Sequence, residues 1–230
     1  MKKLRQFILK YLLRIVFYFV VFSLVIVVPF RWLNPPVTMV MVDRWLGADD
    51  HFELKQRWLS WDKIPKQAAL AVVSSEDQLF PEHAGFDFGA IFKVLGSLGS
   101  GRQLRGASTI SQQVARNVYL WTGRSWIRKG LEVWFTLLIE LTWSKQRILE
   151  VYMNVAEWGE GVFGLEAASL HHFGKSAKRL SPMQMALLAS CLPSPLKYDP
   201  VRPSQHVYER AVWNLEQQKR LGGVHWLNFD

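Results

Sequence analysis

The sequence has little cysteine, with Cys191 as the only one among 230 residues. A single thiol forms no intramolecular disulfide, so a disulfide-built scaffold is excluded, although an oxidising compartment is not. The paired CxxC spacing of zinc and redox sites is also missing. Internal repeats and low-complexity tracts are absent as well. Half of the residues are hydrophobic and only 20% are charged, which excludes a disordered chain and supplies enough apolar surface for a packed core.

Charge is missing from residues 15–30, directly after a segment rich in lysine and arginine and free of acids. With Arg14 reaching the headgroups, this run is long enough to cross a bilayer, which takes about 20 residues. The alternatives are a cleaved signal peptide and a buried helix, but the VIVV before Pro29 is not a small-residue cleavage site. We therefore expect residues 1–33 to be a cytoplasmic tail and a single-pass anchor in the cytoplasmic (inner) membrane, with the remainder of the chain outside the cytoplasm.

Residues 34–60 begin with Asn-Pro-Pro and are expected to be a linker and juxtamembrane segment, whose secondary structure the pattern leaves undetermined. Residues 61–230 show helical periodicity and little strand-type alternation. They predict one all-α domain, large enough for its own core, behind the transmembrane helix. The expected helices span about 66–79, 108–120, 126–142, 144–154, 163–172, 181–191 and 204–221.

Acidic residues are absent between Asp87 and Glu132, a stretch rich in bases and glycine. A solvated basic surface is one explanation. An anion site is the other, because Arg128 and Lys129 fall near the start of a predicted helix, where positive charge opposes the macrodipole. Bases beside free helix N–H groups bind phosphate or diphosphate. The bases are Lys93, Arg102, Arg105, Arg116, Arg124, Arg128 and Lys129.

Carboxylates supply the second half of the expected chemistry. Glu76 and Asp77 end an apolar helix, where acidic charge opposes the dipole. Burial would raise the pKa of Glu76 and suit it to general acid or base work, whereas a solvated helix end is the alternative. Glu132 either pairs with Arg128 within its helix or acts in a site. His83 belongs either to a turn or core or to the site.

Five motifs, in order over about residues 60–200, resemble those of the peptidoglycan glycosyltransferases, the lysozyme-like domain of bifunctional penicillin-binding proteins. Ser111 stands where threonine is usual in the second motif, and Gln184 replaces a common glutamate in the fifth. The motifs are EDQLFPEHAG at 76–85 (EDxxFxxHxG), GASTISQQ at 106–113 (GxSTITQQ), RKGLE at 128–132 (RKxxE), ILEVYMN at 148–154 (ILExYLN) and the region 173–195.

The resemblance implies a lysozyme-like glycosyltransferase that polymerises lipid II into β-1,4-linked glycan and releases undecaprenyl diphosphate. It implies that Glu76 is the general base that deprotonates the acceptor 4-hydroxyl, with inversion at the donor carbon. Arg116, Arg128 and Lys129 would stabilise the departing diphosphate. Glu132 would be the second catalytic glutamate, holding these bases or a divalent ion. The residues expected to form the site or bind substrate are Asp77, His83, Ser108, Thr109, Gln112, Gln113 and Asn117.

The expected partners are lipid II, the growing lipid-linked glycan, the bilayer and cell-wall or divisome proteins. Nucleic acid is not expected, since the N-terminus accounts for much of the excess positive charge. No cofactor is required, although Mg²⁺ or Mn²⁺ would suit carboxylates that meet a diphosphate. Apolar residues in the region 88–100 either enter the membrane or form a core helix. Two other functions stay open: a peptidoglycan-cleaving lysozyme-like enzyme, which needs no diphosphate site, and a noncatalytic scaffold of the wall machinery.

Overall fold

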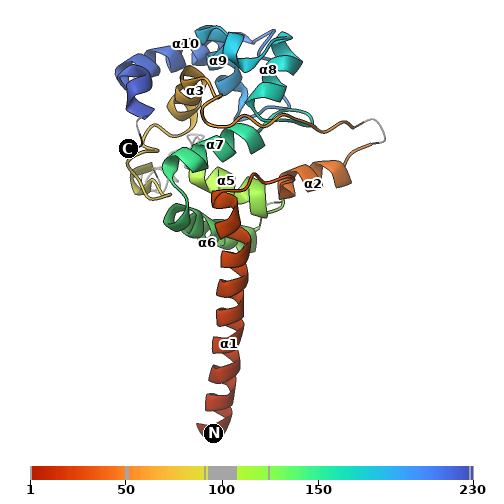
Figure 1. The fold of residues 1–230 in the computed structure, drawn as a ribbon, viewed down its shortest axis with the longest axis vertical. Coiled ribbons are helices and arrows are strands. Elements are labelled where there is room, and N and C mark those ends of the chain that lie inside the picture. The colour runs from red at the N-terminus through yellow and green to blue at the C-terminus, as the bar shows by residue number, and fades with distance from the viewer. Residues whose placement is uncertain are drawn as a thin grey trace.

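The computed structural model describes residues 2–49, 52–90, 92, 108–123, 125–227 and 229. A long helix, α1 (Lys2–Val27), continues into a 3₁₀ turn, η1 (Val28–Arg31), and extends away from the rest of the molecule as a stem (Figure 1). The elements that follow are α2 (Met39–Leu46), β1 (Lys55–Gln56), α3 (Lys66–Glu76), α5 (Ile110–Tyr119), α6 (Trp126–Thr142), α7 (Lys145–Val155), β2 (Glu157–Gly159), β3 (Val162–Phe163), α8 (Leu165–Phe173), η2 (Ala177–Arg179), α9 (Pro182–Cys191), α10 (Gln205–Arg220) and η3 (Gly223–Leu227).

The predicted all-α class is confirmed, because each of the seven helices expected from periodicity is present with ends within a few residues of those expected. Within the described ranges, β structure is limited to a small sheet of order β1-β3-β2, with β1 parallel and β2 antiparallel to β3. Residues 34–60, expected to be a linker, contribute both α2 and β1 to the body of the molecule.

The local sequence determines where most helices begin. At most helix starts, a Ser or Thr side chain accepts a hydrogen bond from a backbone N–H of the first turn. The capping residues are Thr38, Thr109, Ser125, Ser144, Ser181 and Ser204. Helix α8 instead begins after Gly164, which has a φ of +82°. A Cβ there would lie 2.8 Å from the carbonyl oxygen of Asn154, so both the backbone angle and the space require glycine.

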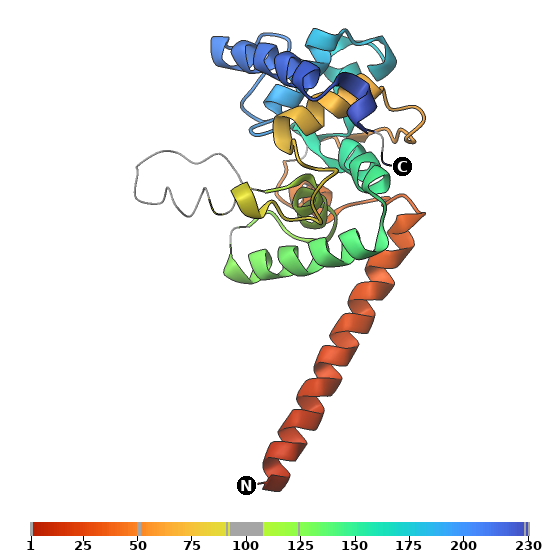
Figure 2. The ribbon, with the colours of Figure 1, turned by 90° about the vertical axis from the view of Figure 1, so that its left-hand side faces the viewer.

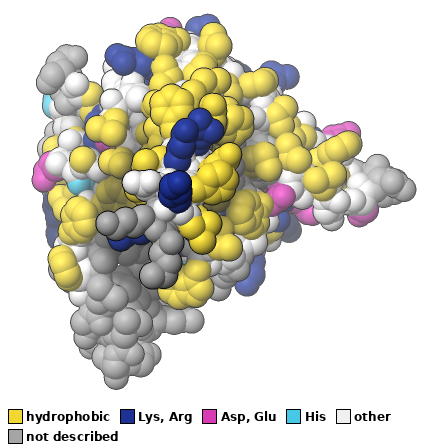
Figure 3. Space-filling model, turned by 90° about the horizontal axis from the view of Figure 1, so that it is seen from below, with side chains coloured by type: hydrophobic (Ala, Val, Ile, Leu, Met, Phe, Trp, Pro, Cys, Tyr) yellow, Lys and Arg dark blue, Asp and Glu magenta, His cyan; other side chains and the backbone are white. Residues whose placement is uncertain are grey.

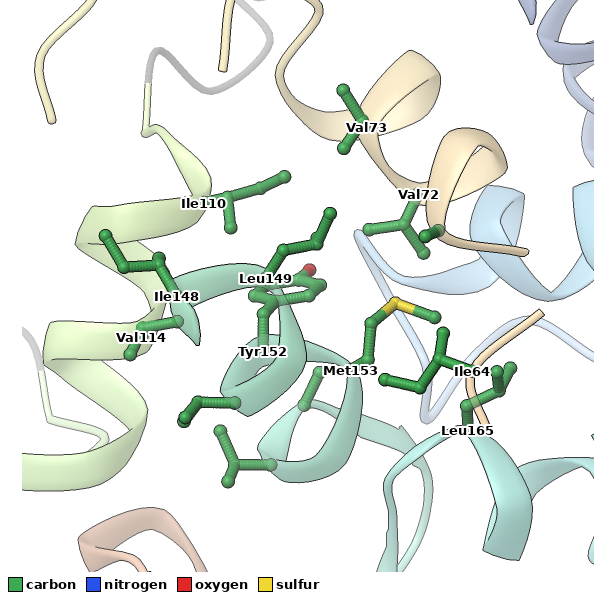
Figure 4. Close-up of a cluster of buried hydrophobic side chains, with 14 of the residues drawn as sticks. Ile64, Val72, Val73, Ile110, Val114, Ile148, Leu149, Tyr152, Met153 and Leu165 are labelled. Atoms are coloured by element: carbon green, nitrogen blue, oxygen red, sulfur yellow. The ribbon is translucent and has the colours of Figure 1, made fainter. Parts of the chain in front are cut away.

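Helix α7 lies at the centre of the core, between α5 on one side and α3 and α8 on the other (Figure 4). Ile148 points toward Ile110 and Val114 of α5, whereas Met153 points toward Val72 of α3 and Ile64 (Figure 4). These side chains are all buried, so α7 is apolar around most of its circumference, as expected for a central helix. This packing fixes the position of the last turn of α7, which contributes to the site described below.

The stem joins the body through specific contacts at its C-terminal end. Trp134 of α6 donates its indole N–H to Ser23 Oγ at 3.1 Å, and Trp143 donates to the carbonyl oxygen of Val27 at 3.1 Å. The first part of α1 is exposed on all sides and makes no comparable contact within the described chain (Figure 2). The body is therefore attached to one end of an otherwise bare apolar helix.

Arg147, at the start of α7, fixes the chain where it leaves the stem. Its guanidinium donates to the carbonyl oxygens of Phe30 at 3.0 Å and Leu33 at 2.6 Å, and to Asn34 Oδ1 at 3.1 Å. Glu150 Oε2 lies 3.2 Å away and balances the charge. A buried guanidinium with this many acceptors holds the exit segment against α7.

Candidate active site

Glu76 is the last residue of α3, and its carboxyl group stands at the edge of an apolar helix. Gln113 Nε2 of α5 donates to Glu76 Oε2 at 3.0 Å. Burial raises the pKa of Glu76 above its ordinary value, and the Gln113 hydrogen bond together with the positive charges of Arg210 and Arg116 offsets this in part. Gln113 binds only one of the two carboxylate oxygens, and Glu76 also lines one of the hollows described below. The group is thus a more basic carboxylate than usual with a lone pair available to a ligand.

Tyr152 of α7 orients this hydrogen bond. Burial raises the pKa of its hydroxyl well above the ordinary value, so the phenol stays protonated at neutral pH. It donates to Gln113 Oε1 at 3.2 Å, which leaves Gln113 Nε2 to face Glu76. The two contacts together fix which end of the Gln113 amide points to the carboxylate.

Asp77, the next residue, joins the end of α3 to the start of α5. Its carboxylate accepts from the backbone N–H of Ile110 at 2.9 Å and contacts His83 Nε2 at 2.9 and 3.1 Å. The backbone N–H of Gly85 donates to His83 Nδ1 at 3.1 Å, so Nδ1 carries no proton and Nε2 is the donor to Asp77. His83 therefore acts here as a neutral bridge between the turn and Asp77.

The residues at the start of α5 are also occupied by local contacts. Thr109 and Gln112 form a capping box, and Thr109 Oγ1 donates to the carbonyl oxygen of Gly85 at 2.7 Å. Both residues are buried, whereas Ser108 is partly exposed. This arrangement makes Thr109 and Gln112 part of the site's framework and leaves Ser108 open to a ligand. Their predicted substrate contacts stay predictions.

The two bases of the RKGLE motif share one buried acid. Arg128 Nη1 donates to Glu132 Oε2 at 2.8 Å, and Lys129 Nζ donates to Glu132 Oε1. Glu132 is only 2% exposed, so it lies behind the bases as their counter-charge. The intrahelical pair considered from the sequence is therefore present. Arg128 Nε is buried and has no acceptor in the described part of the chain, so it has a hydrogen bond left for a ligand.

Two hollows flank the contact between Glu76 and Gln113. The first, of about 330 Å³, is here called the cationic cleft, and Gln113, Arg116 and Arg128 line it. The second, of about 250 Å³, is here called the Glu76 hollow. The cationic cleft is completed by Val40, Arg44, Asn117, Thr122, Tyr152, Ala156, Glu157, Leu192, Pro193 and Pro195, and the Glu76 hollow by Asp77, Gln78, Leu79, Asp87, Ala90, Ser108 and Thr109.

The structure thus brings most of the predicted site residues to one region, around Glu76 and the two hollows. Lys129 and Glu132 lie on the helix that carries Arg128 but do not line the cleft. Phe88 and Phe92, from the region expected either to enter the membrane or to form a core helix, are exposed. The other apolar residues of that region lie outside the described residues, namely Ile91, Val94, Leu95 and Leu98. Four of the predicted bases also lie outside them, namely Lys93, Arg102, Arg105 and Arg124.

The sequence analysis did not single out three of the side chains that line the cleft, namely those of Tyr152, Arg44 and Glu157. Tyr152 stands inside a quoted motif, and its spacing from Ile148 and Leu149 on one helix was the available signal. Arg44 and Glu157 gave no local signal, since they come from segments whose structure the sequence left open.

A divalent metal would need oxygen ligands near the diphosphate site. Both oxygens of Glu132 are already engaged by cationic side chains, so as placed this residue offers no ligand. Across the described ranges, no three His, Cys, Asp or Glu side chains converge into a metal-binding group. The use of Mg²⁺ or Mn²⁺ stays a prediction.

A helical domain with a basic carboxylate beside a cationic cleft is the arrangement expected of an enzyme that combines a general base with an anion site. Residues 45–219 match the family model described as Transglycosylase. The chain is 52% identical over 221 residues to the biosynthetic peptidoglycan transglycosylase of Pseudomonas aeruginosa, covering 95% of this chain and 94% of that relative. It is 49% identical to the protein of that name from Ectopseudomonas mendocina (94% and 91% covered) and 46% identical to that from Stutzerimonas stutzeri (97% and 93% covered).

The chain therefore belongs to the transglycosylase family, as its five motifs predicted. Membership confirms the lysozyme-like glycosyltransferase fold class and the assignment to glycosyl transfer in peptidoglycan synthesis.

Proposed function

We propose that this chain polymerises lipid II into β-1,4-linked glycan strands and releases undecaprenyl diphosphate, with Glu76 as the general base. Family membership supports the reaction class. The observation that carries the mechanism is that Glu76 lines one hollow while its hydrogen-bond partner, Gln113, lines the cationic cleft. An acceptor sugar in the Glu76 hollow and a donor diphosphate in the cleft would meet beside one carboxylate.

The base chemistry follows from the environment of Glu76. The raised pKa makes the carboxylate a better proton acceptor, and the oxygen that Gln113 does not bind is the one that would take the 4-hydroxyl proton of the acceptor. The deprotonated oxygen then attacks the donor carbon from the side opposite the diphosphate, so its configuration inverts. Because Glu76 lines one hollow and its partner Gln113 lines the other, an acceptor and a donor bound in the two hollows would lie close together.

The leaving group would be held by the cationic cleft. Arg116 and Arg128 line it, and the unused Nε of Arg128 is a donor for a phosphate oxygen. Arg128 also sits in the first turn of α6, where the helix dipole favours an anion. Glu132 keeps Arg128 and Lys129 in position before the negative charge develops, which is how preorganised electrostatic stabilisation works.

The membrane location rests on α1. Among the described residues, only Lys3–Arg31 is a helix long and apolar enough to cross a bilayer, and it is 11% buried. The basic residues before this span favour an N-terminus in the cytoplasm and a catalytic domain outside it, in a cytoplasmic-membrane protein. Protease accessibility of an N-terminal tag in intact spheroplasts tests this, and digestion of the tag from outside would contradict it.

The exposed side chains of α6 also favour a membrane at the end of the body from which the stem leaves. It lies where the stem leaves the domain (Figure 1), and the exposed side chains of Val133, Leu137 and Leu141 recur along it at four-residue intervals. The view along the stem shows apolar side chains over this underside, with acidic ones mostly at its margins (Figure 3). An apolar helix face beside an anchor is expected to rest in the headgroup region, which would bring the cationic cleft close to lipid-linked diphosphates.

The test is polymerisation of labelled lipid II by the purified full-length chain in detergent, with products separated by size. Wild type should make polymer, and Glu76→Gln should slow it by roughly 10²-fold or more. Glu82→Gln is the matched control, because Glu82 is an exposed acid of the same motif and should retain normal turnover. Near-normal turnover by Glu76→Gln would exclude Glu76 as the base.

Two further readouts separate the alternatives. Release of fragments from sacculi, with no polymer from lipid II, would instead support a peptidoglycan-cleaving enzyme. Folded protein with neither activity would favour a scaffold. Parallel reactions with a chelator decide whether a divalent metal is needed, since loss of polymer that added Mg²⁺ or Mn²⁺ restores would establish it.

A further inference from the structure

One wall of the cationic cleft is an ion pair that joins two distant parts of the chain. Arg44 of α2 directs Nε and Nη2 to the same oxygen of Glu157, Oε2, at 2.9 and 2.8 Å. Both side chains line the cleft together with Arg116 and Arg128. The neighbouring Asp43 anchors α2, because its Oδ2 accepts from the backbone N–H and the hydroxyl of one cleft residue, Thr122. Arg44 is thus presented by a helix that is itself docked at the cleft.

The second oxygen of Glu157 is unused. The Glu157 side chain is only 9% exposed, and Oε1 is buried with no hydrogen-bond partner in the described ranges. A buried carboxylate oxygen without a donor is costly to the fold, and such groups in native proteins call for a ligand or another explanation. Because Glu157 lines the cleft, a bound ligand is in reach to supply that donor.

The diphosphate of the substrate cannot supply the missing hydrogen-bond donor to Glu157 Oε1. An ionised diphosphate has oxygens that only accept hydrogen bonds, and its negative charge repels a carboxylate. Arg44 weakens that repulsion by pairing with Oε2, but it does not satisfy Oε1. A neutral donor on a ligand group beside the diphosphate would satisfy Oε1. In the proposed substrate, the sugar bonded to the diphosphate carries such donors, namely an acetamido N–H and a hydroxyl group.

We propose that Glu157 Oε1 accepts a hydrogen bond from the donor sugar next to the diphosphate, and that Arg44 holds the Glu157 carboxylate in place for this contact. The inference rests on the proposed function. In this arrangement Arg116 and Arg128 bind the charged group, whereas Glu157 distinguishes a saccharide diphosphate from the bare polyprenyl diphosphate that the reaction releases. The contact favours exchange of the spent product for a new substrate, because the product lacks the sugar.

The test compares the binding of two ligands to the full-length protein in detergent: lipid II and undecaprenyl diphosphate. Glu157→Gln keeps the side-chain shape and removes its charge. It should weaken lipid II binding by about fivefold to tenfold, because a neutral amide oxygen accepts a weaker hydrogen bond than a carboxylate does, and leave undecaprenyl diphosphate binding unchanged or tighter. Arg44→Ala should weaken both ligands, because it leaves the Glu157 charge unbalanced in the cleft.

Controls make the result specific. Glu160→Gln removes an exposed carboxylate from the same hairpin and should change neither affinity. Thermal unfolding of each variant verifies that it is folded. Glu157→Met supplies a second variant, which keeps the size of the side chain but has no comparable acceptor, and it should lose at least as much lipid II affinity as Glu157→Gln. Equal weakening of both ligands by Glu157→Gln would show that Glu157 only holds Arg44, and unchanged binding of both would exclude any contact. Wild type that binds neither ligand would overturn the proposed function and this inference together.

Discussion

Replacing Glu76 by glutamine should stabilise the folded protein at neutral pH even though it removes the proposed base. Burial raises the pKa of Glu76 above its ordinary value of 4.5, since the ionised carboxylate is disfavoured away from water. Ionising this group costs more free energy in the folded protein than in the unfolded chain, and this difference lowers the free energy of unfolding of wild type at pH 7. Glutamine is never ionised, and its Oε1 can still accept the hydrogen bond from Gln113 Nε2 that now reaches Glu76.

The size of the effect depends on pH in a defined direction. Below about pH 4.5 the carboxyl group is protonated in the folded and the unfolded chain alike, so the two proteins should differ little. As the pH rises, the unfolded chain ionises first, and wild type loses stability until the folded group has ionised too. Each unit by which the folded pKa is raised contributes about 1.4 kcal/mol, and 1 kcal/mol corresponds to roughly 2–4 °C in Tm for a domain of this size.

The assay is thermal unfolding of both proteins in one detergent at a series of pH values from 4 to 8. The Tm difference in favour of Glu76→Gln should be small at the acidic end, grow through the raised pKa and then level off. Glu82→Gln serves as the control, because its exposed carboxylate should give no such pH-dependent offset. A Glu76→Gln variant that is less stable than wild type at pH 7, or an offset that is equal at every pH, would refute the reasoning.

Four further substitutions have expected results. Gly164→Ala should destabilise the fold by about 1–3 kcal/mol in chemical unfolding, because Gly164 has a positive φ and lies close to the carbonyl of Asn154. Gly130→Ala, in open space within α6, should instead stabilise the fold by about 0.5–1 kcal/mol. Equal effects of the two substitutions would contradict this reasoning. Arg128→Ala should lower the rate of lipid II polymerisation by roughly 10²-fold, and unchanged kinetics would remove it from the diphosphate role. Arg147→Met should destabilise the fold by about 2–5 kcal/mol and make the exit from α1 more sensitive to protease, and normal protection would show that the stem is held elsewhere.

The helices were predictable because their signals are local. The apolar period places α6 and α7, and a Ser or Thr cap marks where most of the helices begin. Local reasoning also singled out Arg128 and Lys129, since two bases in a first helical turn oppose the dipole. Their shared partner Glu132 lies within one turn, so even this ion pair was open to sequence analysis.

The rest of the site depends on contacts between distant residues. Arg44 and Glu157 are 113 positions apart, and nothing near either one in the sequence indicates the other. The Tyr152 hydroxyl likewise reaches Gln113 only because the core packs α7 against α5. Periodicity identifies which residues are helical, but it does not say which helix faces meet, and the orientation of the Gln113 amide toward Glu76 follows only from that pairing.

Two of the helices that contribute to the site, α6 and α7, also hold the stem, so the fold sets how far the site lies from the end of α1. Helix α7 binds the exit segment through Arg147 and reaches the site with Tyr152, five positions further on and therefore about 7.5 Å along the helix axis. Helix α6 contacts α1 through Trp134 and presents Arg128 to the cleft from its first turn. These hydrogen bonds hold the domain directly against the end of α1. A substrate whose diphosphate is held at the membrane surface by its own lipid would meet the cleft without either partner leaving the bilayer.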